Sequence, residues 1–397
     1  MNVFLTILIA QLFCFFGGGY LLPYGFLFFG LNIIYCAIAY NQSFFLTIFQ
    51  RKNIFLYLFV TFYFFTSDFD ANSTLFVFSA YTPILFSQFH KKLLQSNPVG
   101  DKPTKVFLLI VLILLIYYAY KSFVLLQSNE MALRYLVSTE KDATLGIDGF
   151  GIPYASSLLA PYLFYLIKKN KISRPLQIFL FAVCVILVLL VMRSLFMTAL
   201  LLMALGFLYV FIIDKTLKQK ILISLFFIIS IVAALGVITT LVHVIFGEFS
   251  VIAVRYDEIL QILSGSGISS TEDVGNRFIR LNRSINLFFE HPLFGVGWIT
   301  EYNFEELERI GVGNHAQWID MFAYYGLFAI VPLYYIKINM TDYVKNNNPA
   351  LLIFIILGFL NPCMKFIIVF VVFYYIPLFN YEFNFYNQSK LRTNEKS

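Results

Sequence analysis

Long apolar runs alternate with short polar connections along almost the whole chain. A helix needs about 20 apolar residues to cross a hydrocarbon core about 30 Å thick. Twelve runs approach that length, and they cover residues 2–17, 21–40, 53–67, 72–89, 105–126, 150–167, 175–192, 194–213, 220–246, 315–336, 349–361 and 364–385. Inside a bilayer each backbone N–H and C=O group needs an internal partner, so these runs are expected to be helices. The pattern predicts an all-α integral membrane protein with about twelve transmembrane helices, forming a single membrane domain over residues 1–397.

The composition agrees with this fold class. Hydrophobic residues make up 60% of the chain and charged residues 13%, whereas soluble globular proteins are about 45–50% apolar and about 25% charged. A water-soluble core could not enclose so many apolar side chains. The four cysteines lie in or beside apolar runs without the spacing of metal ligands, so they indicate neither a disulfide framework nor a zinc site. They are expected to face lipid or to pack between helices.

Basic residues separate the connections into two groups. One group holds fifteen lysines but only three arginines, and it includes Lys168, Lys169 and Arg174. The positive-inside rule assigns this group and both termini to the cytoplasm. The other group holds three lysines and seven arginines. A guanidinium group is a planar fork that suits carboxylate or phosphate, so the arginine excess predicts an anionic ligand on the outer side. For any single arginine, pairing with an acid of the same loop is the alternative.

The longest connection, residues 247–314, lies on the outer side between the ninth and tenth predicted spans. Connections longer than about 12–15 residues usually carry function or are disordered. Within this one, residues 273–290 are predicted to form an amphipathic helix, because apolar and basic residues each recur there at helical spacing. The apolar stripe consists of Phe278, Leu281, Ile285 and Phe288, and the adjoining side carries Arg277, Arg280 and Arg283.

This helix is expected to lie along the membrane surface, with its arginines at the level of lipid-linked phosphates. The alternative is a helix that merely binds anionic lipid. The inner connections are short and lack a G-x-x-x-x-G-K-[ST] motif, which argues against ATP or nucleotide-sugar chemistry. The chain also has no HExxH motif and no acidic cluster with the spacing of metal ligands, so we predict no metal and no other cofactor. Outer-side chemistry must then use an activated substrate already in the membrane.

The outer loop and the span after it share an order of residues with a known family. The shared positions are Arg277, Pro292, Gly295, Gly297, His315 and Gly326. This order resembles the superfamily of O-antigen polymerases and O-antigen ligases. Arg193-Ser194 at the outer start of the eighth span adds to the resemblance, which covers about residues 190–330. Two positions depart from it: Ala316 stands where an amide or hydroxyl residue is usual, and Ala329 replaces a second glycine.

The resemblance implies a GT-C-like fold and a metal-independent, inverting glycosyltransferase. Its donor would be a growing glycan on undecaprenyl pyrophosphate, and its acceptor would be a single lipid-linked repeat unit. Breaking the glycosyl–phosphate bond builds negative charge on the pyrophosphate, which positioned hydrogen-bond donors can stabilise. Arg193 and Arg277 are therefore predicted to be catalytic. The predicted substrate-binding residues are Arg193, Arg277, Arg280, Arg283 and Asp320.

The same reaction needs a base for the hydroxyl group of the acceptor. His315 is the predicted catalytic base, because an unperturbed histidine has a pKa of about 6.5. Asp320 is the alternative, either as the base or as the partner of an outer arginine. His315 could instead be an interfacial residue beside Trp318.

The chain is expected in the bacterial inner membrane, with its site facing the periplasm. The expected partners are an undecaprenyl-pyrophosphate-linked oligosaccharide and membrane lipids, with a chain-length regulator protein as a candidate and no nucleic acid. Two alternatives to a polymerase remain: a ligase that transfers finished glycan to lipid A core, and a flippase for lipid-linked oligosaccharide. A flippase would have two pseudo-symmetric halves without a single long loop, and this chain has no internal repeat.

Overall fold

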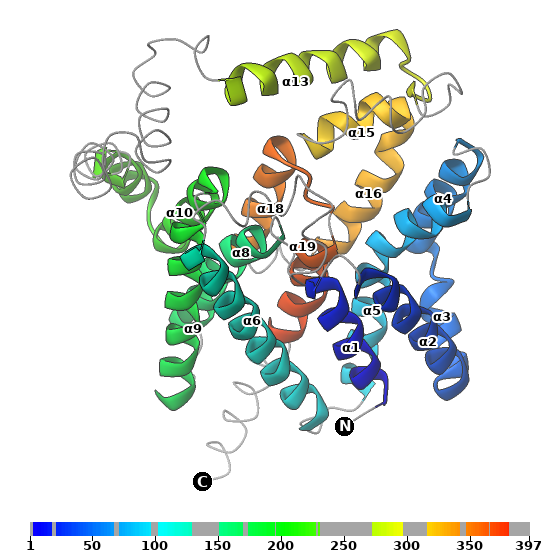
Figure 1. Ribbon diagram of the computed structural model, residues 1–397, viewed down its shortest axis with the longest axis horizontal. Helices are drawn as coiled ribbons and strands as arrows, with labels where there is room; N and C mark the ends of the chain where they lie inside the picture. Colours follow the sequence, from blue (N-terminus) through cyan, green and yellow to red (C-terminus); the bar gives the residue numbers. More distant parts are fainter. Residues whose placement is uncertain are drawn as a thin grey trace.

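Figure 1 shows a computed structural model of the chain, in which helices pack around one another. The structure describes residues 3–17, 21–66, 71–96, 102–128, 151–169, 174–194, 196–227, 229–230, 272–296, 316–341, 347–364 and 366–380. Within these ranges the regular secondary structure is helical throughout, without a strand. The predicted all-α class is confirmed for this part of the chain.

Apart from those at Asn41–Ile48 and Glu272–Glu290, the α-helices fall within or overlap the apolar runs of the sequence. Before residue 130 they are α1 (Val3–Gly17), α2 (Leu22–Ala39), α3 (Asn41–Ile48), η2 (Arg51–Asn53), α4 (Ile54–Thr66), α5 (Ala71–Ser96) and α6 (Lys102–Ser128). After it come α8 (Gly151–Lys169), α9 (Arg174–Arg193), α10 (Met197–Ile212), α13 (Glu272–Glu290), α15 (Gln317–Tyr325), η6 (Gly326–Ala329), α16 (Ile330–Asn339), α18 (Pro349–Leu360), α19 (Phe366–Phe370) and η7 (Val371–Tyr375). Of the predicted run 220–246, the helix 217–227 covers the beginning, and the part beyond residue 230 lies outside the described residues.

Three helices are long and apolar enough to cross a membrane. They are Leu108–Gln127 within α6, Arg174–Arg193, and Gln317–Asn339, which comprises α15, η6 and α16. Shorter apolar helices accompany them at Thr6–Phe15, Pro23–Ala39, Met197–Ile212, Pro349–Leu360 and Ile367–Asn380. Helices of this length and composition, all in the described part of the chain, are those of a membrane-embedded helical protein.

A fully buried helix lies in the middle of the assembly, where α19 continues into η7 (Figure 1). It contacts α1, α5, α8 and α18. The segment η7 is a π-helix, in which the Ile376 N–H group donates to Val371 O, five residues back. Pro377 follows and has no N–H group to continue a regular ladder, which is consistent with this local change of bonding. All four cysteines are buried and free, so they serve as packing residues.

The short helix α3 has no counterpart among the predicted runs. It begins with the polar residues 41–43 and ends at Ile48, where carbonyl groups would lack partners within the helix. The buried Asn53 supplies one: its Nδ2 donates to Thr47 O over 2.9 Å and to Ile48 O over 3.0 Å. Tyr57 OH also donates to Ile48 O, over 2.9 Å. The side chains of Asn53 and Tyr57 therefore cap α3. A hydropathy pattern does not predict such caps.

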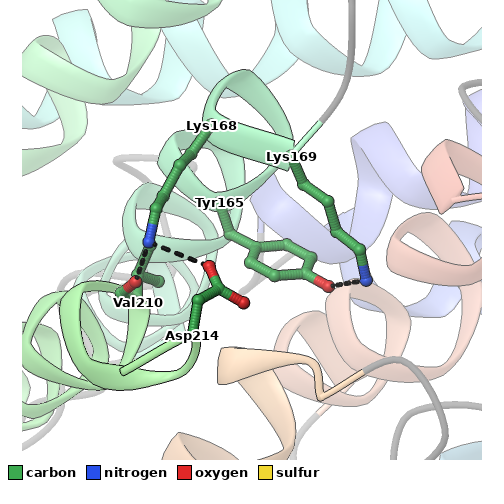
Figure 2. Close-up of polar contacts among 5 residues, drawn as sticks. All are labelled: Tyr165, Lys168, Lys169, Val210 and Asp214. Atoms are coloured by element: carbon green, nitrogen blue, oxygen red, sulfur yellow. Dashed lines mark hydrogen bonds and ion pairs between the residues drawn. The ribbon is translucent and has the colours of Figure 1, made fainter. Parts of the chain in front are cut away.

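Figure 2 shows the polar contacts between α8 and α10, on the side that the charge pattern assigns to the cytoplasm. Lys168 Nζ lies 3.2 Å from Asp214 Oδ2 and donates to Val210 O over 2.8 Å. The lysine thus places a positive charge at the carboxyl end of α10, where the helix dipole favours it. Lys169 Nζ donates to Tyr165 OH over 2.6 Å. Lys168 therefore ties two neighbouring helices together at their polar ends, whereas the Lys169–Tyr165 bond lies within α8.

Candidate functional site

The amphipathic helix predicted over residues 273–290 is confirmed as α13. It lies along one edge of the assembly, over α15, which it contacts (Figure 1). The helix ends before Pro292, whose ring cannot continue the hydrogen-bond ladder. His291 closes the last turn by donating its N–H group to Leu287 O over 3.0 Å. Because α15 begins the candidate span Gln317–Asn339, this contact joins α13 to the start of a membrane helix.

The side of α13 that packs most deeply is not its apolar stripe. Ser284 has no exposed surface and Leu287 is 7% exposed. In contrast, Leu281 and Ile285 of the apolar stripe are only half-buried, and the neighbouring Phe289 is 72% exposed. At 100° per residue, the packed side is turned by roughly a quarter of a turn from the stripe. The described residues of the apolar stripe are therefore only half-buried, with Phe288 against the Phe322 ring of α15, while a serine is fully buried.

The helical spacing relates two of the predicted arginines to this packed side. Residues 277, 280, 284 and 287 recur at intervals of three and four, which aligns them along one side of a helix. We call Arg277, Arg280, Ser284 and Leu287 the α13 seam. Arg280 is half-buried within it. Along the seam, Arg280 lies one turn before Ser284, and Arg277 lies nearly one turn before Arg280. The side chain of Arg277 lies outside the described part of the structure.

Arg283 lies beside the seam, on the exposed side of α13. It borders an open groove of about 380 Å³ whose described lining is Ile279, Asn282, Arg283, Asn286, Leu287 and Glu290. Two amides, a guanidinium and a carboxylate supply both hydrogen-bond donors and acceptors along this groove. Such a lining suits an oxygen-rich ligand, either a phosphate held by the arginine or sugar hydroxyl groups.

Asp320 connects α13 with the start of α15. Its side chain is 4% exposed, and Ser284 Oγ donates to its Oδ1 over 2.7 Å. The Ala316 N–H group donates to Oδ2 over 3.0 Å, while Asp320 N–H donates back to Ala316 O over 2.8 Å. This reciprocal pair satisfies a backbone donor at the helix start, in the manner of a capping box. The geometry gives Asp320 a structural connection to two elements, and a role as the base stays a prediction.

Two glycines of the family-like pattern each lie against the backbone of the segment that holds the other: Gly295 against Tyr324 and Tyr325, and Gly326 against Pro292 and Leu293. Gly295 has φ +69° and Gly326 has φ +56°, conformations that L side chains rarely adopt. A Cβ atom on Gly326 would lie 2.5 Å from Leu293 C, and one on Gly295 would collide with the backbone of Tyr324. Leu327 N–H donates to Pro292 O over 2.7 Å across the same contact. The turn after α13 is therefore locked onto the junction of α15 and η6, which explains why both positions are glycine.

The opposite side of α15 is fixed to α18. Trp318 Nε1 donates to Ile355 O over 2.9 Å, and its indole lies against Gly358, where a Cβ atom would collide with the ring. Gln317 Oε1 accepts from the Met364 N–H group over 3.3 Å. The first turn of α15 is consequently held from both sides, by α13 and by the α18 region.

Arg193 is the last residue of α9 and is half-buried. Its Nη2 lies 3.5 Å from Leu126 O of α6. The adjacent Ser194 is buried, and its Oγ donates to Val191 O over 2.8 Å. These contacts tie Arg193 to α6, whereas those of α13 involve α15. The described part of the structure thus brings Arg280 and Asp320 onto one pair of helices and leaves Arg193 on another.

His315, the predicted base, lies outside the described residues, immediately before Ala316. Ala316 itself is buried at 4% exposure, so the residue that departs from the family pattern occupies a packed position. Among the described residues, no three His, Cys, Asp or Glu side chains come together as a candidate metal site.

Sequence reasoning missed Ser284. It placed the helix along the membrane surface and treated the arginine side as the face of a ligand. The available signal was a small polar residue four positions after Arg280, in register with the arginines. A serine there lets two helices approach and still offers a hydroxyl group to a buried acceptor.

A comparison with known protein families and with curated protein sequences finds no match for this chain.

Proposed function

We propose that this protein is a polymerase of O-antigen or a related bacterial surface polysaccharide. It would transfer a growing glycan from undecaprenyl pyrophosphate to a lipid-linked repeat unit, on the periplasmic side of the inner membrane. The proposal includes twelve transmembrane helices in a GT-C-like arrangement, with both termini in the cytoplasm. The resemblance over about residues 190–330 is its starting point.

The α13 seam is the observation that carries the proposal. Arg280 is half-buried on the side of α13 that packs on α15, and Arg277 lies on the same side of the helix. Guanidinium groups held on a packed helix side can be preorganised, whereas an arginine in free solution must first be ordered. An arginine-rich helix of this kind supports binding of a lipid-linked pyrophosphate at the membrane surface.

The chemistry follows from these donors. The bond between the anomeric carbon and the pyrophosphate oxygen breaks, and the acceptor oxygen bonds to that carbon from the opposite face. Negative charge then develops on the leaving pyrophosphate, where Arg277, Arg280 and Arg193 would stabilise it. The acceptor proton passes to His315 in this scheme. Arg283 and the amides of the adjacent groove would hold sugar hydroxyl groups or a phosphate.

Lipopolysaccharide from a strain lacking this gene tests the proposal. Loss of a polymerase leaves a core that carries one repeat unit, and restoring the gene restores the ladder of longer chains on a gel. Bare core in the deletion strain would instead indicate a ligase or a flippase. An unchanged ladder would refute all three functions.

A further inference from the structure

The α13–α15 contact contains a buried charged group, the carboxylate of Asp320. A carboxylate with 4% exposure loses most of its hydration, so it must gain hydrogen bonds in compensation. Its two oxygens accept from different elements: Oδ1 from Ser284 of α13, and Oδ2 from the backbone of Ala316. An aliphatic residue could pack between two helices without that cost, so packing alone does not account for an acid here.

Each of these bonds fixes a particular element. The Ala316 N–H group belongs to the peptide bond that follows residue 315, so the bond to Oδ2 sets the start of α15. Ser284 lies one turn after Arg280 on the α13 seam, so the bond to Oδ1 sets the register of the arginines. A slide of α13 by a single residue, about 1.5 Å, would break a bond of 2.7 Å.

A second contact holds the other end of α13. Pro292 O accepts from Leu327 N–H, Gly295 lies against the Tyr324 backbone, and Gly326 lies against the Leu293 backbone. With one attachment at Ser284 and another after the end of the helix, α13 can neither slide nor rotate freely over α15. The two attachments lie on opposite sides of Leu287, which is buried between them.

We infer that Ser284 and Asp320 are positioning residues, which hold the arginines of α13 in register with the start of α15. Neither needs to touch substrate. The pair transmits the position of one helix to the other, so the arginines of α13 keep a fixed place relative to the start of α15. The effect of this pair on turnover rests on the proposed function, whereas its effect on the placement of α13 does not.

The test uses four variants of the full-length protein in detergent or nanodiscs: Ser284→Ala, Asp320→Asn, the double variant, and Gln317→Ala. Gln317 is a matched control, because it is a half-buried polar residue in the first turn of α15 whose hydrogen bond goes to Met364 and not to α13. Trypsin cleavage after Arg280 and Arg283 reports how firmly α13 is held. This measurement needs no substrate.

We expect Ser284→Ala and Asp320→Asn to be cut faster at these arginines than the unmodified protein and Gln317→Ala. If Ser284→Ala and Asp320→Asn are cleaved at the same rate as the unmodified protein and Gln317→Ala, the inference is overturned, whatever the function. If the unmodified protein makes no polymer, the proposed function fails, and the cleavage rates still decide whether the pair holds α13.

In a polymerase assay with purified lipid-linked repeat units, each single variant should lower kcat on the order of 10-fold to 100-fold, with KM little changed. The double variant should lose little more than the worse single variant, because both changes break the same connection. Multiplied losses in the double variant, or normal kcat per folded protein in either single variant, would show that the pair does not position the site.

Discussion

The α13–α15 contact and the α8–α10 contact each depend on one charged side chain. The side chain is buried in the first contact and exposed in the second. Asp320 is 4% exposed and accepts from Ser284 and Ala316. In the other contact the side chains of Lys168 and Asp214 are 38% and 74% exposed. Water solvates an exposed ion pair whether or not it forms, so such a pair contributes about 0–1 kcal/mol. When a buried carboxylate loses a hydrogen-bond partner, no water molecule takes the place of that partner.

The two regions also differ in the kind of cation. The α8–α10 contact uses Lys168, and a lysine can set membrane topology by its positive charge without a need for particular geometry. The α13 seam carries arginines, whose planar fork binds phosphate or carboxylate in a defined orientation. Under the proposed function, the lysines of one region would set orientation in the membrane and the arginines of the other would bind a ligand. Four experiments can break or sharpen this comparison.

The largest effect is expected from His315→Ala. If this residue takes the acceptor proton, turnover should fall by about 10²-fold to 10⁴-fold while donor binding stays nearly intact. The residual rate should no longer fall as the pH drops through about 6.5, because the titrating group is gone. His90→Ala, on the predicted cytoplasmic side, is the control and should leave turnover unchanged. Near-normal turnover of His315→Ala would move the base role elsewhere.

The arginines come next. Arg277→Lys and Arg193→Lys keep the charge but lose the bidentate fork, so each should lower polymerase activity by about 10²-fold at matched protein levels. Glycan length on a gel, together with kcat from purified protein, measures the loss. Arg174→Lys at the start of α9 is the control for an arginine on the lysine-rich side. Glycan of normal length from both lysine variants would show that these arginines do not form a pyrophosphate site.

A smaller effect, on stability, is expected from Gly326→Ala. A Cβ atom there meets the Leu293 backbone at 2.5 Å, in a backbone conformation that suits only glycine, so the variant should be less stable by at least about 2 kcal/mol. Gly30→Ala in α2 is a matched control, since a Cβ atom at Gly30 would meet nothing within 4 Å. Alanine should be neutral there, or stabilising by up to about 1 kcal/mol. Equal thermal unfolding midpoints in detergent would contradict the close contact at Gly326.

The smallest effect tests the comparison directly. Asp214→Asn should change the free energy of unfolding by less than about 0.5 kcal/mol, because both partners of this ion pair are exposed. The same substitution at Asp320 should cost about 1.5–3 kcal/mol, because a buried acceptor is replaced by an unmatched donor. Denaturant titration of the two variants under identical conditions gives both values. Similar costs at the two positions would mean that burial does not separate the two regions.

Much of the fold could be predicted from local pattern. Apolar runs matched helices such as α9 and α10, because a run of this length has no other way to satisfy its backbone in lipid. The amphipathic helix α13 was also predictable, since its periodicity is a property of neighbouring residues. The same reasoning named Gly295 and Gly326 without explaining them, and it offered no reason for α3, which depends on caps from Asn53 and Tyr57.

The sequence by itself determined the helical class, the positions of the apolar helices and the arginines of α13. Only the tertiary structure decided which side of α13 packs, that Ser284 meets Asp320, and that Gly295 and Gly326 each lie against the backbone of the other's segment. Ser284 and Asp320 are 36 positions apart, so neither the spacing along one helix nor the identity of either residue predicts their bond. Periodicity describes how side chains are distributed around one helix, whereas burial depends on which other helix arrives to cover them.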